Sequence, residues 1–488
     1  MSHVVKKSQF MQIKANKYLH KSYDVWFCHT VMLLSFSITN FRSFREEQTL
    51  SLVASNRQNN LLQHLSPVPD DDNKVLPIAV VYGANGAGKS NLVKGLAFVQ
   101  RQVLFGSKPG RPILWQPFLL GKDAPHDPSS FNLQLIGAKH AFAYGFRITS
   151  SVVTEEWLVL LREGREIVVF ERLTRPDGSV EVEPGEAITG DGYGDHAKVV
   201  ALAKVGVRAN QLFLASVRSS LDEAAYGPLL QEVVGWFVAL QIVMPEADFL
   251  PLADWIAKDP AFADFAGNFL RDADTGVQRL KVETVEVGDA GLGLPQDFIK
   301  ELVEDTPPGE VRVRRVKGLG DVIAQRDANM KIRLRRLLAE HNTEAGKAVS
   351  FPFQEEADGT QRLTHLLPAL YQLRHQPRIY VIDEIDRSLH PLLAKKFVEY
   401  FLTACQGGRG QLIFTTHETN FLDQDLLRRD EYWFAAKDQQ SGATELYSLD
   451  EYRIRTDLKL DKGYVHGRFG AVPLLGRLEN QIDALCRP

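Results

Sequence analysis

The stretch GANGAGKS, residues 83–90, constrains the fold of this 488-residue chain more than any other. It fits the pattern G-x-x-x-x-G-K-[ST], in which a glycine-rich backbone curls so that its N–H groups face phosphate oxygens. The apolar run 78–82 before it predicts a buried strand. After it, apolar residues at helical spacing (92, 96, 99 and 103) predict a helix. A strand that leads through such a loop into a helix N-terminus is the context of a phosphate-binding loop.

Each part of the predicted loop has its own role. Lys89 is expected to reach the β- and γ-phosphates, and Ser90 to bind Mg²⁺. ATP is favoured over GTP because no guanine-binding N-K-x-D segment is found. The expected cofactors are therefore ATP and Mg²⁺. The residues expected to surround the nucleotide here are Gly83, Ala84, Asn85, Gly86, Ala87, Gly88, Lys89, Ser90 and Asn91.

A second group of candidate residues lies far downstream. The apolar run 379–382 ends in Asp383 and Glu384, the form expected of a buried strand that delivers carboxylates to a nucleotide. Asp383 is expected to hold Mg²⁺, and Glu384 to orient and deprotonate the attacking water. A further strand-like run ends at His417, which is expected to hydrogen-bond the γ-phosphate or that water. The predicted catalytic residues are thus Glu384, His417 and Lys89. The plainer alternatives are a strand that ends in solvated acids and a histidine that only satisfies a polar neighbour.

A further anion-binding geometry is predicted at residues 358–360. Asp358, Gly359 and Thr360 precede apolar residues at helical spacing, so a glycine turn meets a helix N-terminus. One ATP needs only one phosphate loop. The second helix end is therefore expected to reach across a dimer to the ATP of the partner.

The order of these motifs resembles an ABC-type ATPase head of the RecF and structural-maintenance-of-chromosomes class. It resembles more closely the compact AAA-family ATP-binding proteins of bacterial abortive-infection and anti-phage loci. The matching stretches are 34–44 (LSFSITNFRSF), the phosphate loop, 358–360, Asp383-Glu384, 385–391, His417, and Gly463-Tyr464 through Gly470. The resemblance implies an α/β P-loop ATPase head with an antiparallel β subdomain and a compact, mainly helical insertion.

The resemblance also implies ATP-driven head-to-head dimerisation, or a higher homo-oligomer, with Asp358, Gly359 and Thr360 as the signature that completes the partner's site. Arg42 is then expected near the nucleotide. Two positions depart from the pattern. Ala357 stands where a signature serine is expected, and Gln116 is only a weak candidate for the Q-loop glutamine.

Four segments are predicted along the chain. Residues 1–31 show no period and are expected to be a disordered or mis-called extension, with Met32 as the natural start. Residues 32–195 are expected to form the N-terminal lobe of the head, with an antiparallel meander from 131 to 172. Helical spacing predicts a lid or sensor insertion at 196–345, and 346–488 are expected to form the C-terminal lobe.

Composition limits the remaining classes. A net charge of −4 means that any nucleic-acid contact needs a local patch. Three separated cysteines without a C-x-x-C pair indicate a reducing cytoplasm, and no apolar run reaches membrane-spanning length.

The resemblance implies a sensor and regulatory scaffold of an anti-phage defence system. Residues 418–488 are too few for a fused nuclease domain, so the effector is expected to be a separate protein, such as a Toprim- or HNH-type nuclease, and the trigger a phage protein. The alternative is a DNA-repair or DNA-end-binding ATPase. It is supported by a basic cluster, which a solvated strand and helix face would also explain: Arg312, Arg314, Arg315, Lys317, Lys331, Arg333, Arg335 and Arg336.

Overall fold

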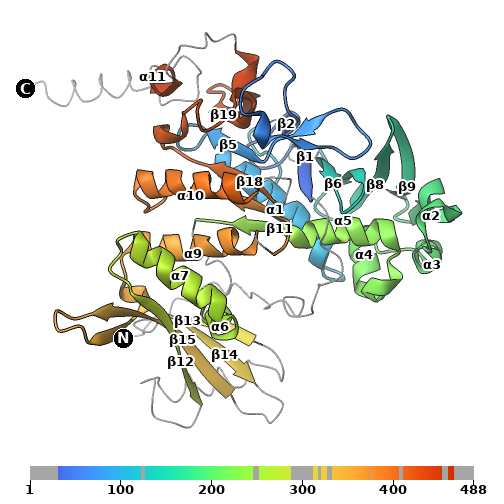
Figure 1. Cartoon of the computed structure of the whole chain (residues 1–488). Helices are drawn as coiled ribbons and strands as arrows, with labels where there is room; N and C mark the ends of the chain where they lie inside the picture. Colours follow the sequence, from blue (N-terminus) through green and yellow to red (C-terminus); the bar gives the residue numbers. More distant parts are fainter. Residues whose placement is uncertain are drawn as a thin grey trace, which may run out of the picture. The chain divides into compact units, whose positions relative to one another are not determined.

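The computed structural model describes residues 31–121, 127–245, 252–286, 311–316, 320–326, 332–373, 375–405, 410–452 and 460–465 (Figure 1). These residues pack as two compact units. The larger, called the head below, is drawn from 26–246 and 372–488, and the smaller, called the insertion unit, from 247–371. Of the predicted extension 1–31, only Val31 lies within the described residues.

A six-stranded sheet carries the predicted phosphate loop. Its order is β11 (Leu240–Val243), β17 (Arg378–Ile382), β18 (Gly410–Thr415), β5 (Ile78–Tyr82), β19 (Tyr432–Lys437) and β20 (Thr444–Ser448). Neighbouring strands are parallel except β19 and β20. Every residue of β5 is buried, as expected of a central parallel strand covered on both faces.

Two long helices follow strands of this sheet. Helix α1 (Lys89–Phe105) follows β5 and buries the four apolar residues at the predicted spacing. A Cβ atom at Gly95 would lie 2.6 Å from Ile38 Cδ1, so glycine lets α1 approach the neighbouring strand closely. Helix α10 (Pro391–Ala404) begins after His390, whose Nδ1 accepts a hydrogen bond from the Leu392 N–H at 3.3 Å.

A seven-stranded antiparallel sheet forms the β subdomain of the head. Its order is β10 (Val180–Pro184), β9 (Arg165–Thr174), β8 (Val153–Arg162), β7 (Ala141–Ile148), β6 (Ser129–Ile136), β1 (Met32–Thr39) and β2 (Gln48–Ser51). Residues along β8 alternate between buried and less buried positions, since successive side chains point to opposite faces. The predicted meander from 131 to 172 is present as β6 to β9. A small antiparallel pair, β3 (Ser66–Pro67) and β4 (Lys74–Val75), lies between β2 and β5 along the chain.

The side chain of Gln411 links the two sheets. Its Oε1 accepts the Leu33 N–H at 2.7 Å, and its Nε2 donates to the carbonyls of Leu33 and Leu76, both at 2.9 Å. Gln411 lies on β18 and is fully buried. Three backbone groups in the interior of the head therefore depend on one side chain.

Four helices and β11 separate the β subdomain from the insertion unit along the chain. They are α2 (Glu186–Thr189), α3 (Ala197–Val205), α4 (Phe213–Ser220) and α5 (Pro228–Ala239). Their apolar residues belong to the same buried cluster as β1 and α1. Trp236 of α5 is fully buried and donates its Nε1–H to the Met32 carbonyl at 3.0 Å. These helices are therefore part of the head.

The insertion unit combines helices with an antiparallel sheet. The sheet order is β12 (Arg279–Glu286), β15 (Ile332–Asn342), β14 (Gly320–Arg326) and β13 (Val311–Val316), and β16 (Ala348–Pro352) also pairs with β15. Helices α6 (Leu252–Lys258), α7 (Pro260–Asp272) and α9 (Asp358–Gln372) accompany it. Rings of α6, α7 and α9 meet, with Trp255 stacked on Phe262 at 4.4 Å and Phe262 5.1 Å from Tyr371.

The limits of this unit differ from the predicted insertion, 196–345. Helices α3 to α5 and β11 pack with the head, and most of α9, which was assigned to the C-terminal lobe, falls within the insertion unit. The expected insertion is mainly helical, whereas this unit has a sheet as well as helices. In the sequence, residues 277–287 and 311–316 alternate between apolar and polar positions, which indicates two of these strands, β12 and β13.

The last described element of the head is helix α11 (Leu460–Val465). Among the described helices, none has both the length and the apolar character needed to cross a bilayer.

Candidate functional site

The phosphate loop joins β5 to α1, as the sequence predicts. Gly86 and Gly88 have φ angles of 79° and 108°, which L side chains rarely adopt. A Cβ atom at Gly83 would lie 2.4 Å from the Ala435 carbonyl oxygen of β19. A Cβ atom at Gly86 would meet nothing within 4 Å, so the backbone there borders open space. Glycine is therefore required at these positions for different reasons. At Gly86 and Gly88 the reason is the backbone angle, and at Gly83 it is close packing.

Lys89 lies at the base of the loop with its ammonium turned inward. Nζ donates to the carbonyls of Gly83 at 2.8 Å and Ala84 at 3.3 Å, and lies 3.0 Å from His417 Nε2. The residue is only 6% exposed. Burial lowers the pKa of Lys89 to about 8, while the carboxylates of Asp383, Glu384 and Asp386 act in the opposite direction. A cation is therefore held close to where the loop backbone borders open space.

The acidic pair follows β17, and β18 fixes its position. The Thr415 hydroxyl donates to Asp383 Oδ1 at 2.6 Å and accepts the Glu384 N–H at 2.8 Å. Asp383 is 1% exposed, whereas Glu384 is partly exposed and has a φ angle of 50°. This left-handed backbone turns the chain after Asp383, so one carboxylate is buried and the next reaches the surface. Thr415 was not among the predicted site residues, although it lies two residues before His417.

His417 lies directly after β18 and meets the phosphate loop. Burial lowers the pKa of His417, and the positive charge of Lys89 lowers it further. Both effects favour the neutral form of the ring, whose Nε2 then accepts a hydrogen bond from the Lys89 ammonium. The same three carboxylates, Asp383, Glu384 and Asp386, act on His417 and on Lys89. The structure thus brings together the predicted catalytic residues from three parts of the sequence.

Arg42 lies in a tight turn after β1. Its φ angle is 53°, its N–H donates to the Gln116 carbonyl at 2.9 Å, and its guanidinium carbon lies 5.6 Å from the Phe41 ring centre. Among the described residues, Arg42 Nε is buried without a hydrogen-bond partner, and burial lowers the pKa of Arg42. The backbone of Gln116, the Q-loop candidate, therefore lies beside this turn.

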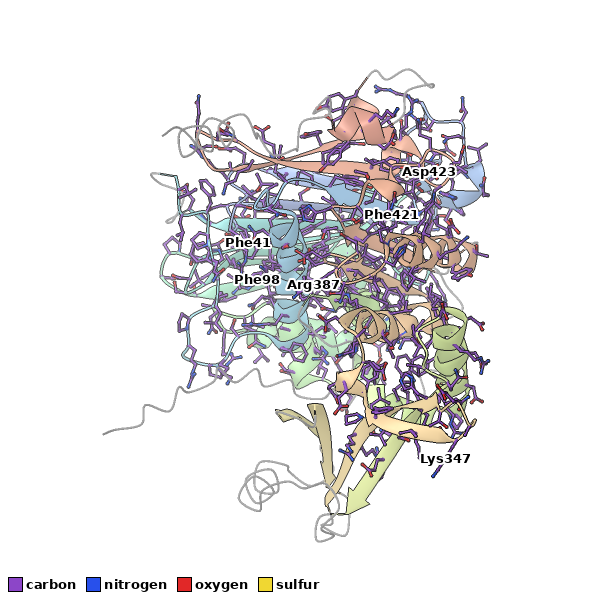
Figure 2. All side chains as sticks on the ribbon, turned by 90° about the vertical axis from the view of Figure 1, so that its left-hand side faces the viewer. Phe41, Phe98, Lys347, Arg387, Phe421 and Asp423 are labelled. Atoms are coloured by element: carbon purple, nitrogen blue, oxygen red, sulfur yellow. The ribbon has the colours of Figure 1, made fainter. Side chains whose placement is uncertain are left out.

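Aromatic rings hold the same turn against α1. The ring of Phe41 lies 5.5 Å from that of Phe98 and 5.3 Å from that of Phe131, and the last two are 5.2 Å apart. Figure 2 labels Phe41 of the turn and Phe98 of α1, which lie close to one another. Packing of this kind fixes the turn next to the phosphate loop.

Hydroxyl groups connect the turn to the loop as well. Ser43 Oγ lies 2.8 Å from both Asn91 Nδ2 and Thr444 Oγ1, and Thr444 Oγ1 donates to the Ala87 carbonyl at 2.8 Å. Asn91, which was expected to bind the cofactor, uses its amide here to contact Ser43. No sequence motif marks Thr444 as part of the site, because it lies in a hairpin far downstream of the phosphate loop.

The C-terminal part of the head also reaches the loop. The Tyr464 hydroxyl accepts a hydrogen bond from the Gly83 backbone, and its ring lies 5.3 Å from Tyr82 and 5.8 Å from Phe434. The remainder of that predicted stretch, 466–470, lies outside the described residues.

The predicted signature lies in the insertion unit. Asp358, Gly359 and Thr360 open helix α9, as the sequence predicts. Asp358 is exposed, Thr360 is buried, and the Thr360 carbonyl accepts the Thr364 hydroxyl at 2.7 Å. Ala357, which replaces the expected serine, is exposed.

Two members of the basic cluster form ion pairs within the insertion unit. Arg335 pairs with Asp254, and Arg336 with Glu283. Their side chains are 15% and 18% exposed. Lys317 and Lys331 lie outside the described residues, and only the backbone of the others is described. The two described guanidinium groups are therefore already engaged, which weakens the cluster as evidence for DNA binding.

A comparison with family models gives a match over residues 78–196 and 266–423. The family is described as "AAA domain, putative AbiEii toxin, Type IV TA system". The matched segments make up more than half of the chain and include the phosphate loop, Asp383, Glu384 and His417. The chain belongs to this family. The head of this family member has the α/β architecture predicted for an ABC-type P-loop ATPase head, since one sheet carries the loop and an antiparallel β subdomain accompanies it.

Similar solved structures are heads of SMC proteins, each with 13% sequence identity to this chain. The SMC head domain from Thermotoga maritima has a TM-score of 0.29, with 85% of this chain and 98% of that chain covered. The SMC head bound to the C-winged helix domain of ScpA has a TM-score of 0.35, with 88% and 99% covered. The SMC head with an extended coiled coil bound to the C-terminal domain of ScpA derived from Pyrococcus furiosus has a TM-score of 0.36, with 90% and 99% covered. A comparison with curated proteins gave no match.

The donor set at the loop suits a nucleotide with Mg²⁺. Mg²⁺ prefers oxygen ligands, usually keeps several waters, and is commonly held by one or two protein oxygens together with phosphates. Ser90 would supply a hydroxyl and Asp383 a carboxylate. Lys89 and the backbone at Gly86 would face the phosphates.

Proposed function

We propose that the protein binds ATP with Mg²⁺ and hydrolyses it to ADP and phosphate. The main support for this proposal is the contact between Lys89 and His417, whose Nζ and Nε2 atoms lie 3.0 Å apart. Burial lowers the pKa of Lys89, and the carboxylates of Asp383 and Glu384 lie close enough to act in the opposite direction. Phosphoryl transfer to water needs positioning and charge stabilisation more than covalent chemistry. The site has a cation, a neutral imidazole and two carboxylates for that purpose.

We assign each residue a role in hydrolysis from its position in the site. Lys89 would stabilise charge on the β- and γ-phosphates, and Ser90 and Asp383 would hold Mg²⁺. When bound, Mg²⁺ neutralises charge on the phosphate oxygens. Glu384, the more exposed carboxylate, would orient the attacking water and take its proton. His417 would accept or donate a hydrogen bond at the γ-phosphate side, since it already contacts Lys89.

Replacement of Glu384 by Gln tests the catalytic assignment. The variant should still bind ATP, while phosphate release should fall at least about 100-fold, because a general base typically contributes that much. Lys89→Ala should lose nucleotide binding. Glu171→Gln, at an exposed position of β9, is the matched control and should keep parental hydrolysis. Parental phosphate release from Glu384→Gln would exclude Glu384 as the base.

We further propose that ATP closes a homodimer in which Asp358, Gly359 and Thr360 complete the partner's site. Support comes from their position at the start of α9, where N–H groups and the helix dipole favour anions. Subunits with Lys89→Ala and subunits with Gly359→Asp should each be inactive alone. Mixed subunits should regain about a quarter of the parental rate, because half of the random dimers then contain one intact composite site. No recovery on mixing would contradict a shared site.

The biological role that we propose is regulation within an anti-phage defence system. The family description, which names a toxin of a toxin–antitoxin system, supports this role. The protein would act as sensor and scaffold, and a phage protein would change its hold on a separate effector, such as a Toprim- or HNH-type nuclease. Expressed with its neighbouring gene, the parental protein should reduce plaque formation, while Lys89→Ala should not. Sensitivity to DNA damage without any change in plaque formation would favour the DNA-repair alternative.

A further inference from the structure

A chain of hydrogen bonds runs from α1 through two hydroxyl groups to the phosphate loop. The Ala87 carbonyl can only accept, so the single hydroxyl hydrogen of Thr444 is directed to it, at an oxygen–oxygen distance of 2.8 Å. Ser43 must then donate to Thr444 Oγ1, also at 2.8 Å. Asn91 Nδ2–H donates to Ser43 Oγ at 2.8 Å. The direction of every bond in this relay is thereby determined.

The relay acts on one peptide unit of the loop, the one between Ala87 and Gly88. In a planar trans peptide the C=O and N–H groups point in opposite directions. With the Ala87 carbonyl turned toward Thr444, the Gly88 N–H is turned to the opposite side. A Cβ atom at Gly88 would lie 2.1 Å from Thr444 Oγ1 and 2.8 Å from Ser43 Oγ, so the two hydroxyls also fill the space that a side chain would need.

We propose that Thr444 is a positioning residue for the nucleotide phosphates, which rests on the ATP binding proposed above. Its hydroxyl holds the Ala87–Gly88 peptide in the orientation that directs the Gly88 N–H at a phosphate oxygen. Gly88 immediately precedes α1, where donated N–H groups and the helix dipole act together. Serial hydrogen bonds also polarise one another, so the Asn91 amide strengthens the bond at Ala87.

The Thr444 side chain is not needed to keep the β19–β20 hairpin in place. The Thr444 backbone N–H donates to the Ser43 carbonyl at 2.7 Å and joins the hairpin to the turn without the hydroxyl. Thr444 is 2% exposed, and valine has nearly the same shape. Removal of the hydroxyl alone therefore separates the orientation of the peptide from packing.

The test compares Thr444→Val with Thr444→Ser by calorimetric titration with ATP and Mg²⁺. Thr444→Val should raise the Kd for ATP about fivefold or more, because a hydrogen bond contributes about 1 kcal/mol and a factor of ten in Kd equals about 1.4 kcal/mol. Thr444→Ser should restore most of the affinity, since it keeps the hydroxyl. Thr403→Val, exposed on α10 and bonded to the Glu399 carbonyl, is the matched control and should bind ATP as the parent does.

The melting temperature of each nucleotide-free variant distinguishes a structural role from a positioning role. A purely structural threonine would lower that temperature in Thr444→Val and leave the Kd unchanged, which would overturn the proposal. If Thr444→Val does not fold, Ser43→Ala interrupts the same relay from the other segment and should raise the Kd, and a parental Kd there would equally overturn it. If the parental protein itself binds no ATP, the proposed function fails instead.

Discussion

For the ATP binding proposed above, the protonation of Lys89 predicts an affinity that depends on pH between pH 7 and pH 9. Burial lowers the pKa of Lys89 to about 8 in the nucleotide-free protein. ATP needs the charged form, so binding above pH 8 must take up a proton. Between pH 7 and pH 9 the charged fraction falls from about nine tenths to about one tenth, and the apparent Kd should therefore rise about tenfold, or about 1.4 kcal/mol.

Two other groups at the proposed site keep the same charge between pH 7 and pH 9.5. The pKa of His417 is lowered from its usual 6.5, so this ring is neutral throughout. A terminal phosphate with a second pKa of about 6 is also deprotonated. The assay is equilibrium titration with ATP and Mg²⁺ at half-unit steps from pH 7 to pH 9.5.

Lys89→Arg provides the matched control, because a guanidinium keeps its charge over this range. Its affinity should be lower than that of the parent at pH 7 but should not change with pH. A parental Kd that stays constant from pH 7 to pH 9.5 would refute the reasoning. A slope that persists in Lys89→Arg would assign the titration to another group.

Three further substitutions test the packing around the site. Gly83→Ala should abolish ATP binding and lower the melting temperature, because the new Cβ atom would lie 2.4 Å from the Ala435 carbonyl oxygen; normal binding would show that β19 can move aside. Gln411→Leu should lower the free energy of unfolding by about 3 kcal/mol or more in denaturant titrations, because three buried backbone groups, two of them on Leu33, lose their partner; a loss below about 1 kcal/mol would mean that water or rearrangement replaces these bonds. Thr415→Val should reduce the rate of phosphate release more than ATP affinity, since it frees both acidic residues from their common hydroxyl; equal changes in both would contradict that role.

Local motifs predicted the centre of the site from the sequence. Each motif follows a strand: the phosphate loop follows 78–82, Asp383 follows 379–382, and His417 follows a further strand-like run. Each motif is therefore predicted to lie at the carboxyl end of a strand. Parallel strands of one sheet bring these ends to the same edge, so convergence follows from local patterns. The structure agrees, since Lys89 contacts His417 and both lie within the influence of Asp383 and Glu384.

Contacts between distant segments were not predictable. Thr444 and Ser43 are ordinary hydroxyl residues, and nothing in either segment indicates that a hairpin will place one against the other. The boundary of the insertion unit could not be predicted for a similar reason. Helical spacing in α3 to α5 shows which face is buried but not the surface that buries it, and these helices pack into the core of the head.

The position of β5 within its sheet has a consequence for biosynthesis. β5 (Ile78–Tyr82) is synthesised long before both of its neighbours, β18 (Gly410–Thr415) and β19 (Tyr432–Lys437). Thr415, His417 and Thr444 are likewise late, so a growing chain has a phosphate loop without the groups that orient it. Pairings this distant in sequence form slowly and only after the intervening segment has been made. In the proposed ATPase, a chain that lacks β18 and β19 would therefore carry the nucleotide motif without the groups that complete the site.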